Sequence, residues 1–388
     1  MTTTRLLRHV NSQKCLRLLR DKGPQSKADL ARELGVTKTT VGYAVGELMD
    51  AGLVVEAGVE QGGGYRGRPG NVLSLNSNGA FFVGVEVTPE HLLAVLCDFS
   101  LAIVRRVNVP IKISEMPAED VVERVKSIVD AMLRESRLAD SDVYGLGMSV
   151  SGIVTPAGKV FIPPVRSWND VDLTVMLTAA MPSGWVIKCC NDAAATAFLI
   201  SEPLPEREKE SLLVLVLASG IGSAVVRNGI VDRGAHGVAG EIGLMRLSDE
   251  LSQSGKTFQE GAGYAHFAKF IGAAKDPEDA LNALAAIAEP DTELLEVLSI
   301  WSDRLAAALL NAIYLLDPAV IVVSGPLSVL YPKVADKVAE RLQAKFIPGL
   351  SVPPIVVDGP GQRLPAVGAA ALIREDLFLL PAFSSVAA

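Results

Sequence analysis

Residues 26–48, SKADLARELGVTKTTVGYAVGEL, constrain the fold of this chain most, because they combine two helical patterns with a tight turn. Leu30, Ala31 and Leu34 recur at the spacing of a buried helix face, and Gly35 suits the left-handed backbone of a turn. The stretch therefore predicts a helical hairpin. In most proteins such a hairpin is structural, and the alternative is a helix-turn-helix that enters DNA.

The second helix of this hairpin would expose polar side chains near its start. Thr37 suits its N-cap, and Val41, Val45 and Leu48 form one apolar stripe. The exposed set combines short polar groups with a cation and an aromatic ring, which suit contacts with base edges and phosphates. The residues of the hairpin that we expect to contact DNA are Ser26, Thr37, Lys38, Thr39, Thr40 and Tyr43.

A β-hairpin wing is predicted directly after these helices. Two β-prone runs, Leu53–Val59 and Asn71–Leu75, flank a loop rich in glycine and arginine. The RGRP sequence at 66–69 resembles the core of an AT-hook, in which arginines favour the negative potential of narrow A·T-rich minor grooves. A solvated loop is the alternative. Behind a helical hairpin, we expect Arg66 and Arg68 to reach the minor groove, and the whole segment predicts a winged helix-turn-helix.

The charge distribution supports a small basic head on an acidic body. Residues 1–75 carry 11 Lys and Arg against 7 Asp and Glu, a net charge of +4. The remaining 313 residues carry 25 against 37, a net charge of −12. The overall net charge of −8 argues against coating of the whole chain by nucleic acid. The split fits a DNA-reading module attached to a domain with another task.

The length of 388 residues predicts two or three domains. No apolar run approaches the length of a membrane span, and the N-terminus lacks a secretory signal, so we expect a cytoplasmic protein without a membrane partner. The four cysteines have no metal-ligand spacing. We expect Cys189 and Cys190 to be buried strand residues and not a strained vicinal disulfide.

Strands and helices alternate from about residue 81, which predicts α/β layers. The expected strands are Phe81–Val87, Leu92–Cys97, Ile103–Pro110, Tyr144–Val150, Trp185–Cys190, Leu212–Leu217, Ala224–Val226, Val320–Ser324 and Pro354–Val357. The expected helices cover residues 118–136, 192–201, 257–272, 292–316 and 330–345.

A series of short motifs in this region resembles the ROK family (repressor, open reading frame, kinase). In chain order the motifs are YGLGMSVSGIV at 144–154, PP at 163–164 with Trp168, NDAAA at 191–195, ASGIG at 218–222, HGVAGEIG at 236–243 and VSGP at 323–326. The kinase members of this family are bacterial sugar kinases of the actin-like ATPase fold. With the head in front, the chain resembles a ROK-type transcriptional repressor.

The resemblance implies a two-lobed, sugar kinase-like body behind the winged head. We expect a DNA-binding domain over residues 1–78 and a first lobe over 79–190 that includes a C-terminal helix at 365–388. A second lobe over 191–364 would carry the ligand cleft and a dimerisation surface.

The phosphate loop of the family's kinases is altered in this chain. The kinases carry Asp-x-Gly-Gly-Thr, whereas here Glu86 takes the place of the aspartate, and Thr88, Pro89 and Glu90 follow it. Proline lacks an N–H donor, and a second carboxylate would repel phosphate. The glycines at 219–222 suit a plain hairpin as well as a second phosphate turn. We therefore expect no enzymatic activity and no cofactor.

The sugar-binding positions of the family are largely present. The resemblance implies that a ligand contacts Ser151, Gly152, Asn191, Asp192, Glu241 and Glu260. Asp192 matches the catalytic base of the kinases. It is also a good N-cap for a helix that starts at Ala193, and the two roles are compatible.

Three departures from the family concern its metal and sugar contacts. Leu244 stands where many members have histidine, and residues 251–258 contain none of the family's zinc-binding cysteines. We therefore expect no metal. Arg166 adds a cation beside the position where the family's asparagine is absent, which would suit an acidic sugar; the alternative, a surface arginine, is the more common case.

Three functions follow from these observations. The preferred one is a DNA-binding repressor, acting as a homodimer or higher oligomer, whose body senses a carbohydrate-like effector and couples it to operator binding. The second is an active ATP-dependent sugar kinase with a DNA-binding head. The third is a repressor whose body only dimerises.

Overall fold

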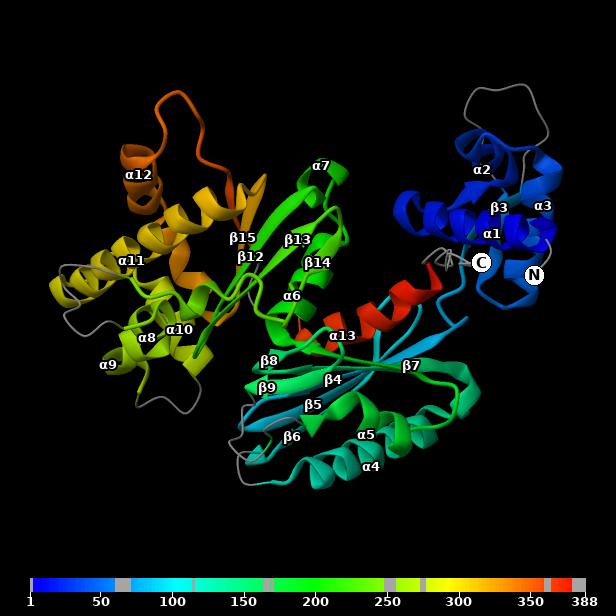
Figure 1. The fold of residues 1–388 in the computed structure, drawn as a ribbon, viewed down its shortest axis with the longest axis horizontal. Helices are drawn as coiled ribbons and strands as arrows, with labels where there is room; N and C mark the ends of the chain where they lie inside the picture. Colours follow the sequence, from blue (N-terminus) through cyan, green and yellow to red (C-terminus); the bar gives the residue numbers. More distant parts are fainter. Residues whose placement is uncertain are drawn as a thin grey trace. The chain divides into compact units, whose positions relative to one another are not determined.

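The structure is a computed structural model that describes residues 3–59, 71–113, 116–162, 168, 171–247, 256–272, 277–358 and 364–378. The chain divides into two compact units, which are taken in turn (Figure 1). Unit 1 contains residues 1–149, 164–189 and 369–388, and unit 2 contains residues 150–163 and 190–368.

The head of unit 1 is a three-helix domain with a small antiparallel sheet. Its elements are α1 (Thr3–Lys22), β1 (Gln25–Ser26), α2 (Lys27–Leu34), α3 (Lys38–Asp50), β2 (Val54–Val59) and β3 (Asn71–Leu75). The sheet order is β1-β3-β2. The predicted helical hairpin is confirmed in detail, because Gly35 has φ +64° after α2 and Thr37 caps α3. Leu30, Val41 and Val45 are fully buried and form the core beneath both helices.

The lobe of unit 1 is built on a five-stranded sheet of order β11-β7-β4-β5-β6. Helices α4 and α5 lie along one face, and the part of α13 in this unit lies on the other (Figure 1). On that second face, a Cβ at Gly147 would approach the Ala369 carbonyl oxygen to 2.0 Å, so glycine permits this contact. The elements are β4 (Phe81–Val87), β5 (His91–Cys97), β6 (Ile103–Pro110), α4 (Ala118–Ser136), η2 (Asp140–Asp142), β7 (Val143–Val150), β10 (Val171–Asp172), α5 (Leu173–Ala180), β11 (Val186–Asn191), α13 (Pro365–Arg374) and η6 (Glu375–Leu377).

Unit 2 is a three-layer α/β structure around a sheet of order β14-β13-β12-β15-β16. Along β12, Leu212 and Val214 pack toward α6, whereas Leu213 and Leu215 pack toward α11 and its neighbours. This alternation follows from the two-residue repeat of a strand. The elements are β8 (Ile153–Val154), β9 (Lys159–Ile162), α6 (Asp192–Ser201), α7 (Glu206–Lys209), β12 (Ser211–Leu217), β13 (Ile221–Arg227), β14 (Ile230–Asp232), η3 (Ile242–Leu244), α8 (Phe258–Ala262), η4 (Tyr264–Phe267), α9 (Ala268–Ile271), α10 (Pro277–Ala286), α11 (Thr292–Leu316), β15 (Val320–Ser324), η5 (Pro326–Lys333), α12 (Ala335–Lys345) and β16 (Ile355–Val357).

Three of the expected helices differ in detail from the structure. The helix expected over 257–272 is divided into α8, η4 and α9, because Gly263 packs so closely that a Cβ would meet the Ser219 carbonyl oxygen at 2.7 Å. The start of the helix expected at 330–345 is the 3-10 segment η5, which contains Pro332. The helix expected over 365–388 ends at Arg374, and residues 379–388 lie outside the described part.

The cysteine prediction is confirmed: Cys189 and Cys190 are buried in β11 and are not joined by a disulfide. Among the described residues, no helix is long and apolar enough to span a membrane.

Candidate DNA-binding head and ligand site

The N-terminal turn of α3 presents the polar face expected of a DNA-reading helix. The Thr37 hydroxyl accepts a hydrogen bond from the Thr40 N–H at 3.2 Å, which fixes the start of the helix. Lys38 and Thr39 are exposed, and Tyr43 retains 59% of its accessible surface. On the opposite side, Val41, Ala44, Val45 and Leu48 are buried in the head. The helix can therefore offer its polar face to a ligand without loss of core packing.

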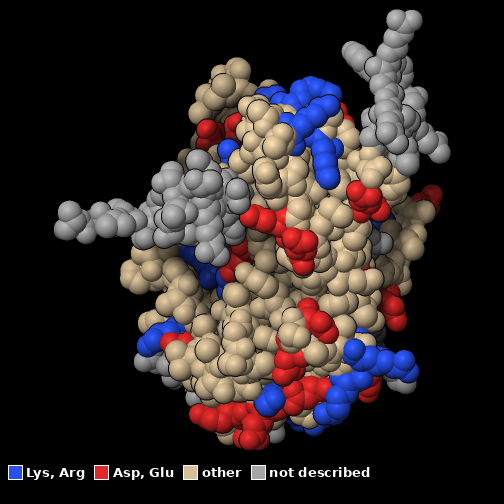
Figure 2. Space-filling view, turned by 90° about the vertical axis from the view of Figure 1, so that its right-hand side faces the viewer, with Lys and Arg blue, Asp and Glu red and all other residues tan. Residues whose placement is uncertain are grey.

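The other residues predicted to contact DNA are placed differently. Ser26 is buried and caps α2, and its hydroxyl lies 2.5 Å from the Asp29 carboxylate. The wing strands β2 and β3 pair in register, with a bulge between Glu56 and Gly58. Arg66 and Arg68 lie outside the described residues. In Figure 2, Lys and Arg side chains form one group at the upper end of the face shown and further groups along its lower edge, where Asp and Glu side chains also lie.

In unit 2, the start of α6 brings together three of the predicted ligand residues. Asn191, and not Asp192 as we expected, is the N-cap of this helix, and its Oδ1 accepts a hydrogen bond from the Ala194 N–H at 2.8 Å. The Asp192 carboxylate accepts hydrogen bonds from the Ala193 N–H at 2.8 Å and from the Ser151 hydroxyl at 3.0 Å. Burial raises the pKa of Asp192 in spite of these bonds.

Glu241 lies in the electrostatic field of Asp192. Burial, and then the negative charge of Asp192, raise the pKa of Glu241 to about 7. Its turn is held by Ser223, whose hydroxyl donates to the Gly240 carbonyl and accepts from the Ile242 N–H. Two carboxylates of this kind can accept hydrogen bonds from the hydroxyls of a sugar, and the protonated form of Glu241 can donate one.

A small depression beside these groups has a volume of about 20 Å³, close to that of one bound water. Its lining includes three polar residues that the sequence analysis missed, Ser223, Asp232 and Arg233. No motif marks them: Ser223 and Asp232 belong to the neighbouring strands β13 and β14, and Arg233 directly follows β14. The full lining is Val154, Asn191, Ala194, Ser223, Ala224, Val231, Asp232, Arg233, Gly237, Ala239 and Glu241.

Gly152 and Glu260 are the remaining predicted ligand residues. Gly152 follows Ser151 directly, with φ +157°. The Glu260 carboxylate is exposed and accepts hydrogen bonds from the Thr257 N–H at 2.7 Å and its hydroxyl at 2.9 Å, forming a capping box at α8. These bonds lower the pKa of Glu260. The carboxylate of Glu260 thus stabilises a helix end in this structure.

The hairpin between β4 and β5, where we expected an altered phosphate loop, satisfies its own backbone N–H groups. The Thr88 hydroxyl accepts hydrogen bonds from the N–H groups of Glu90 and His91 at 3.4 and 3.1 Å. It also lies 2.8 Å from the His91 Nδ1. The backbone N–H groups of Glu90 and His91 therefore already donate within the hairpin, and Pro89 has no backbone N–H. The glycine turn predicted at 219–222 connects β12 to β13 as a hairpin, in which the Ala218 N–H donates to the Gly220 carbonyl at 2.9 Å.

No group of three or more His, Cys, Asp and Glu side chains suited to a metal ion occurs in the part of the chain that the structure describes.

Comparisons with known proteins agree with this architecture. A xylose repressor of Bacillus spizizenii is 22% identical over 378 residues, covering 95% of this chain and 96% of its own length. The "Putative xylose repressor" of Caldicellulosiruptor sp. (strain Rt8B.4) is 28% identical over 259 residues, but this match spans 64% of the chain and only 62% of that relative. A crystal structure described as a ROK family transcriptional regulator, homolog of E. coli MLC protein, superposes with a TM-score of 0.77 at 20% identity and covers 96% of this chain and 97% of its own.

Two family models match the chain. The model for winged helix-turn-helix DNA-binding domains matches residues 11–55, and the ROK family model matches residues 82–376. The chain therefore belongs to the ROK family and carries a winged helix-turn-helix DNA-binding head.

Proposed function

We propose that this protein is a transcriptional repressor that binds operator DNA through α3 and its wing, and that a sugar or sugar-derived effector bound near Asp192 changes its affinity for that DNA. The observation that carries the proposal is the exposed polar turn of α3, with Tyr43 at 59% exposure, on a winged fold whose core is complete without it. The xylose repressors that resemble this chain support a sugar as effector.

We expect the head to contact both grooves of the DNA. Lys38 and the threonines at the start of α3 would meet phosphates and base edges in the major groove, and Arg66 and Arg68 would enter the minor groove. A dimer would place two heads on half-sites about one helical turn apart, and we expect a homodimer or a higher oligomer in the cytoplasm.

The ligand site is proposed to form around the carboxylates of Asp192 and Glu241. Their raised pKa values reflect removal from water, which also strengthens hydrogen bonds to sugar hydroxyls. Ser151, Gly152 and Asn191 flank Asp192 and would complete the contacts. The Glu260 carboxylate could contact the sugar only after it releases its hydrogen bonds to Thr257 at the start of α8.

The experiment that tests this function starts from a duplex selected out of a random library by the full chain. We expect its affinity to fall by roughly 10³-fold or more between about 50 and 200 mM salt. A panel of pentoses, hexoses and sugar acids is then screened by thermal shift, because real binding stabilises the folded state. At least one sugar should raise the melting temperature and change operator affinity. Selection of no sequence would reject the DNA-binding part, and no stabilisation by any sugar would favour a body that only dimerises.

The second candidate is an active sugar kinase, which the presence of Asp192 favours. The hydrogen bonds of the Thr88 hairpin oppose it, because phosphate binding relies on free backbone N–H groups. ATP consumption with the same sugar panel decides between the two, and we expect none. Consumption that disappears in Asp192→Asn would establish the kinase instead.

A further inference from the structure

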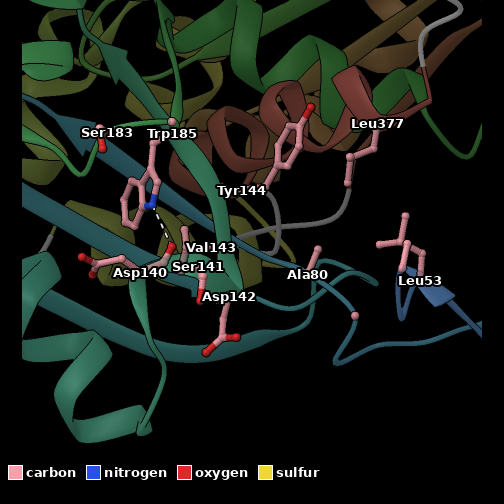
Figure 3. A pocket seen from close by; sticks show the side chains of 13 residues that line it. Leu53, Ala80, Asp140, Ser141, Asp142, Val143, Tyr144, Ser183, Trp185 and Leu377 are labelled. Atoms are coloured by element: carbon pink, nitrogen blue, oxygen red, sulfur yellow. Dashed lines mark hydrogen bonds between the residues drawn. The ribbon is translucent and has the colours of Figure 1, made fainter. Parts of the chain in front are cut away.

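A cavity of about 450 Å³ lies within unit 1, where the head meets the lobe (Figure 3). It contains no residue of the candidate sugar site, which belongs entirely to unit 2. Its volume falls in the range of small-molecule sites and far exceeds that of one or two waters. The lining residues are Ala51, Leu53, Gly79, Ala80, Asp140, Ser141, Asp142, Val143, Tyr144, Ser183, Gly184, Trp185 and Leu377.

The walls of this cavity carry negative charge and aromatic surface. None of its described lining residues is Lys, Arg or His, whereas Asp140 and Asp142 both line it and are exposed. The Trp185 indole N–H donates to the Asp140 backbone carbonyl at 2.9 Å, which fixes the ring next to Asp140, whereas the Asp142 carboxylate points away from the ring (Figure 3). Burial and the charge of Asp376 raise the pKa of the Tyr144 hydroxyl, and the Asp376 carboxylate is itself paired with the Lys188 ammonium.

We propose that this junction cavity binds a small aliphatic amine cation, such as a diamine or polyamine. The carboxylates of Asp140 and Asp142 would accept charge-assisted hydrogen bonds from ammonium groups. The face of Trp185 attracts a cation through its ring quadrupole. The apolar side chains of Leu53, Ala80 and Leu377 would pack against the methylene chain. The same charges disfavour phosphates, sugar acids and nucleotides.

A ligand in this cavity would touch the two attachments of the head. Ala51 is the C-cap of α3, and the turn behind it is packed so tightly that a Cβ at Gly79 would meet the Gly52 carbonyl oxygen at 2.4 Å. Leu377 precedes Phe378, whose carbonyl accepts a hydrogen bond from the Arg17 Nε of α1 at 2.6 Å. Binding of a ligand in the cavity is therefore coupled to the contacts that attach the head to the lobe. We expect an amine to change the affinity for operator DNA, and only this expectation rests on the proposed function.

Intrinsic fluorescence can report the binding directly. The chain has three tryptophans, and Trp168 and Trp301 are fully buried, so a ligand in the cavity acts mainly on Trp185. The full chain is titrated with putrescine and spermidine at about 0.15 M salt and without DNA, so that the result is independent of the repressor function. 1,4-Butanediol serves as the neutral analogue of putrescine, and succinate as the anionic one. We expect a saturable change with the amines alone.

Two variants locate the site. Asp140→Asn with Asp142→Asn should weaken amine binding at least tenfold, whereas Asp336→Asn with Glu340→Gln on α12 removes the same charge elsewhere and should leave the midpoint unchanged. Asn keeps the acceptor that Asp142 presents to the Ala139 N–H at 2.7 Å, so η2 should persist. Ser183→Arg, which places a cation in the cavity, should abolish binding. The proposal is overturned by no saturable change, by an equal response to butanediol, or by equal weakening in both double variants.

Discussion

Replacement of Glu241 by Gln should stabilise the protein at neutral pH. Partial burial beside Asp192 raises the pKa of Glu241 from its ordinary value of 4.5 to about 7. The folded state therefore holds this proton more tightly than the unfolded state does. The contribution of Glu241 to the free energy of unfolding is most favourable below pH 4.5 and is lost as the pH rises to about 7.

The size of this effect follows from the pKa difference. Each pKa unit corresponds to about 1.4 kcal/mol, so the full difference is about 3 kcal/mol, and partial solvent screening reduces it to roughly 1–3 kcal/mol. Glutamine keeps the shape of the side chain but carries no charge at any pH. Its stabilising effect should thus be near zero at pH 4.5 and reach roughly 1–3 kcal/mol at pH 7.5.

Urea unfolding at half-unit steps between pH 4 and 8 measures this difference. Glu260→Gln is the matched control, because hydrogen bonds from Thr257 lower the pKa of Glu260. A carboxylate whose pKa is lowered on folding stabilises the folded state at pH values above its ordinary pKa. This contribution to the free energy of unfolding is lost as the pH falls. The control should therefore destabilise the protein at neutral pH, and less so in acid. A Glu241→Gln variant that is less stable than the parent at pH 7.5, or whose difference does not depend on pH, would refute the reasoning.

Three further predictions concern the head, the ligand turn and the C-terminal segment. Tyr43→Ala should change stability by less than about 0.5 kcal/mol but weaken DNA binding several-fold, as measured by fluorescence anisotropy, because Tyr43 is 59% exposed. Gly237→Ala should cost about 1–3 kcal/mol in urea unfolding, since φ is +84° and its Cβ would approach the Val154 carbonyl oxygen to 2.3 Å. Phe378→Ala should cost about 3–5 kcal/mol and speed proteolysis near α1, because the buried ring also lies 4.4 Å from the Arg20 guanidinium.

Long elements with one clear hydrophobic period were predictable from sequence. The strand Ile103–Pro110 and the helices Ala118–Ser136 and Thr292–Leu316 occur with the bounds expected. Each is long enough for its apolar repeat to dominate local signals. The helix caps at Thr37 and Gly35 were also predictable, because capping depends on near neighbours in the sequence.

Features that depend on tertiary contacts were not predictable. The N-cap of α6 falls on Asn191 and not on Asp192, since both side chains are good helix caps and the local sequence does not choose between them. The break at Gly263 results from a close approach to another turn. Asp232 joins the lining of the depression near Asn191 through the pairing of β14 with β13, which leaves no mark in its local sequence.

The central claim is that sugar binding near Asp192 controls a DNA-binding head. The most direct test measures the affinity of the full chain for its selected duplex by anisotropy, with and without each stabilising sugar, beside Asp192→Asn. The account predicts at least a fivefold change in affinity for the parent, about 1 kcal/mol of coupling, and none for the variant. An operator affinity that no sugar alters, or that sugar alters equally in Asp192→Asn, would contradict it.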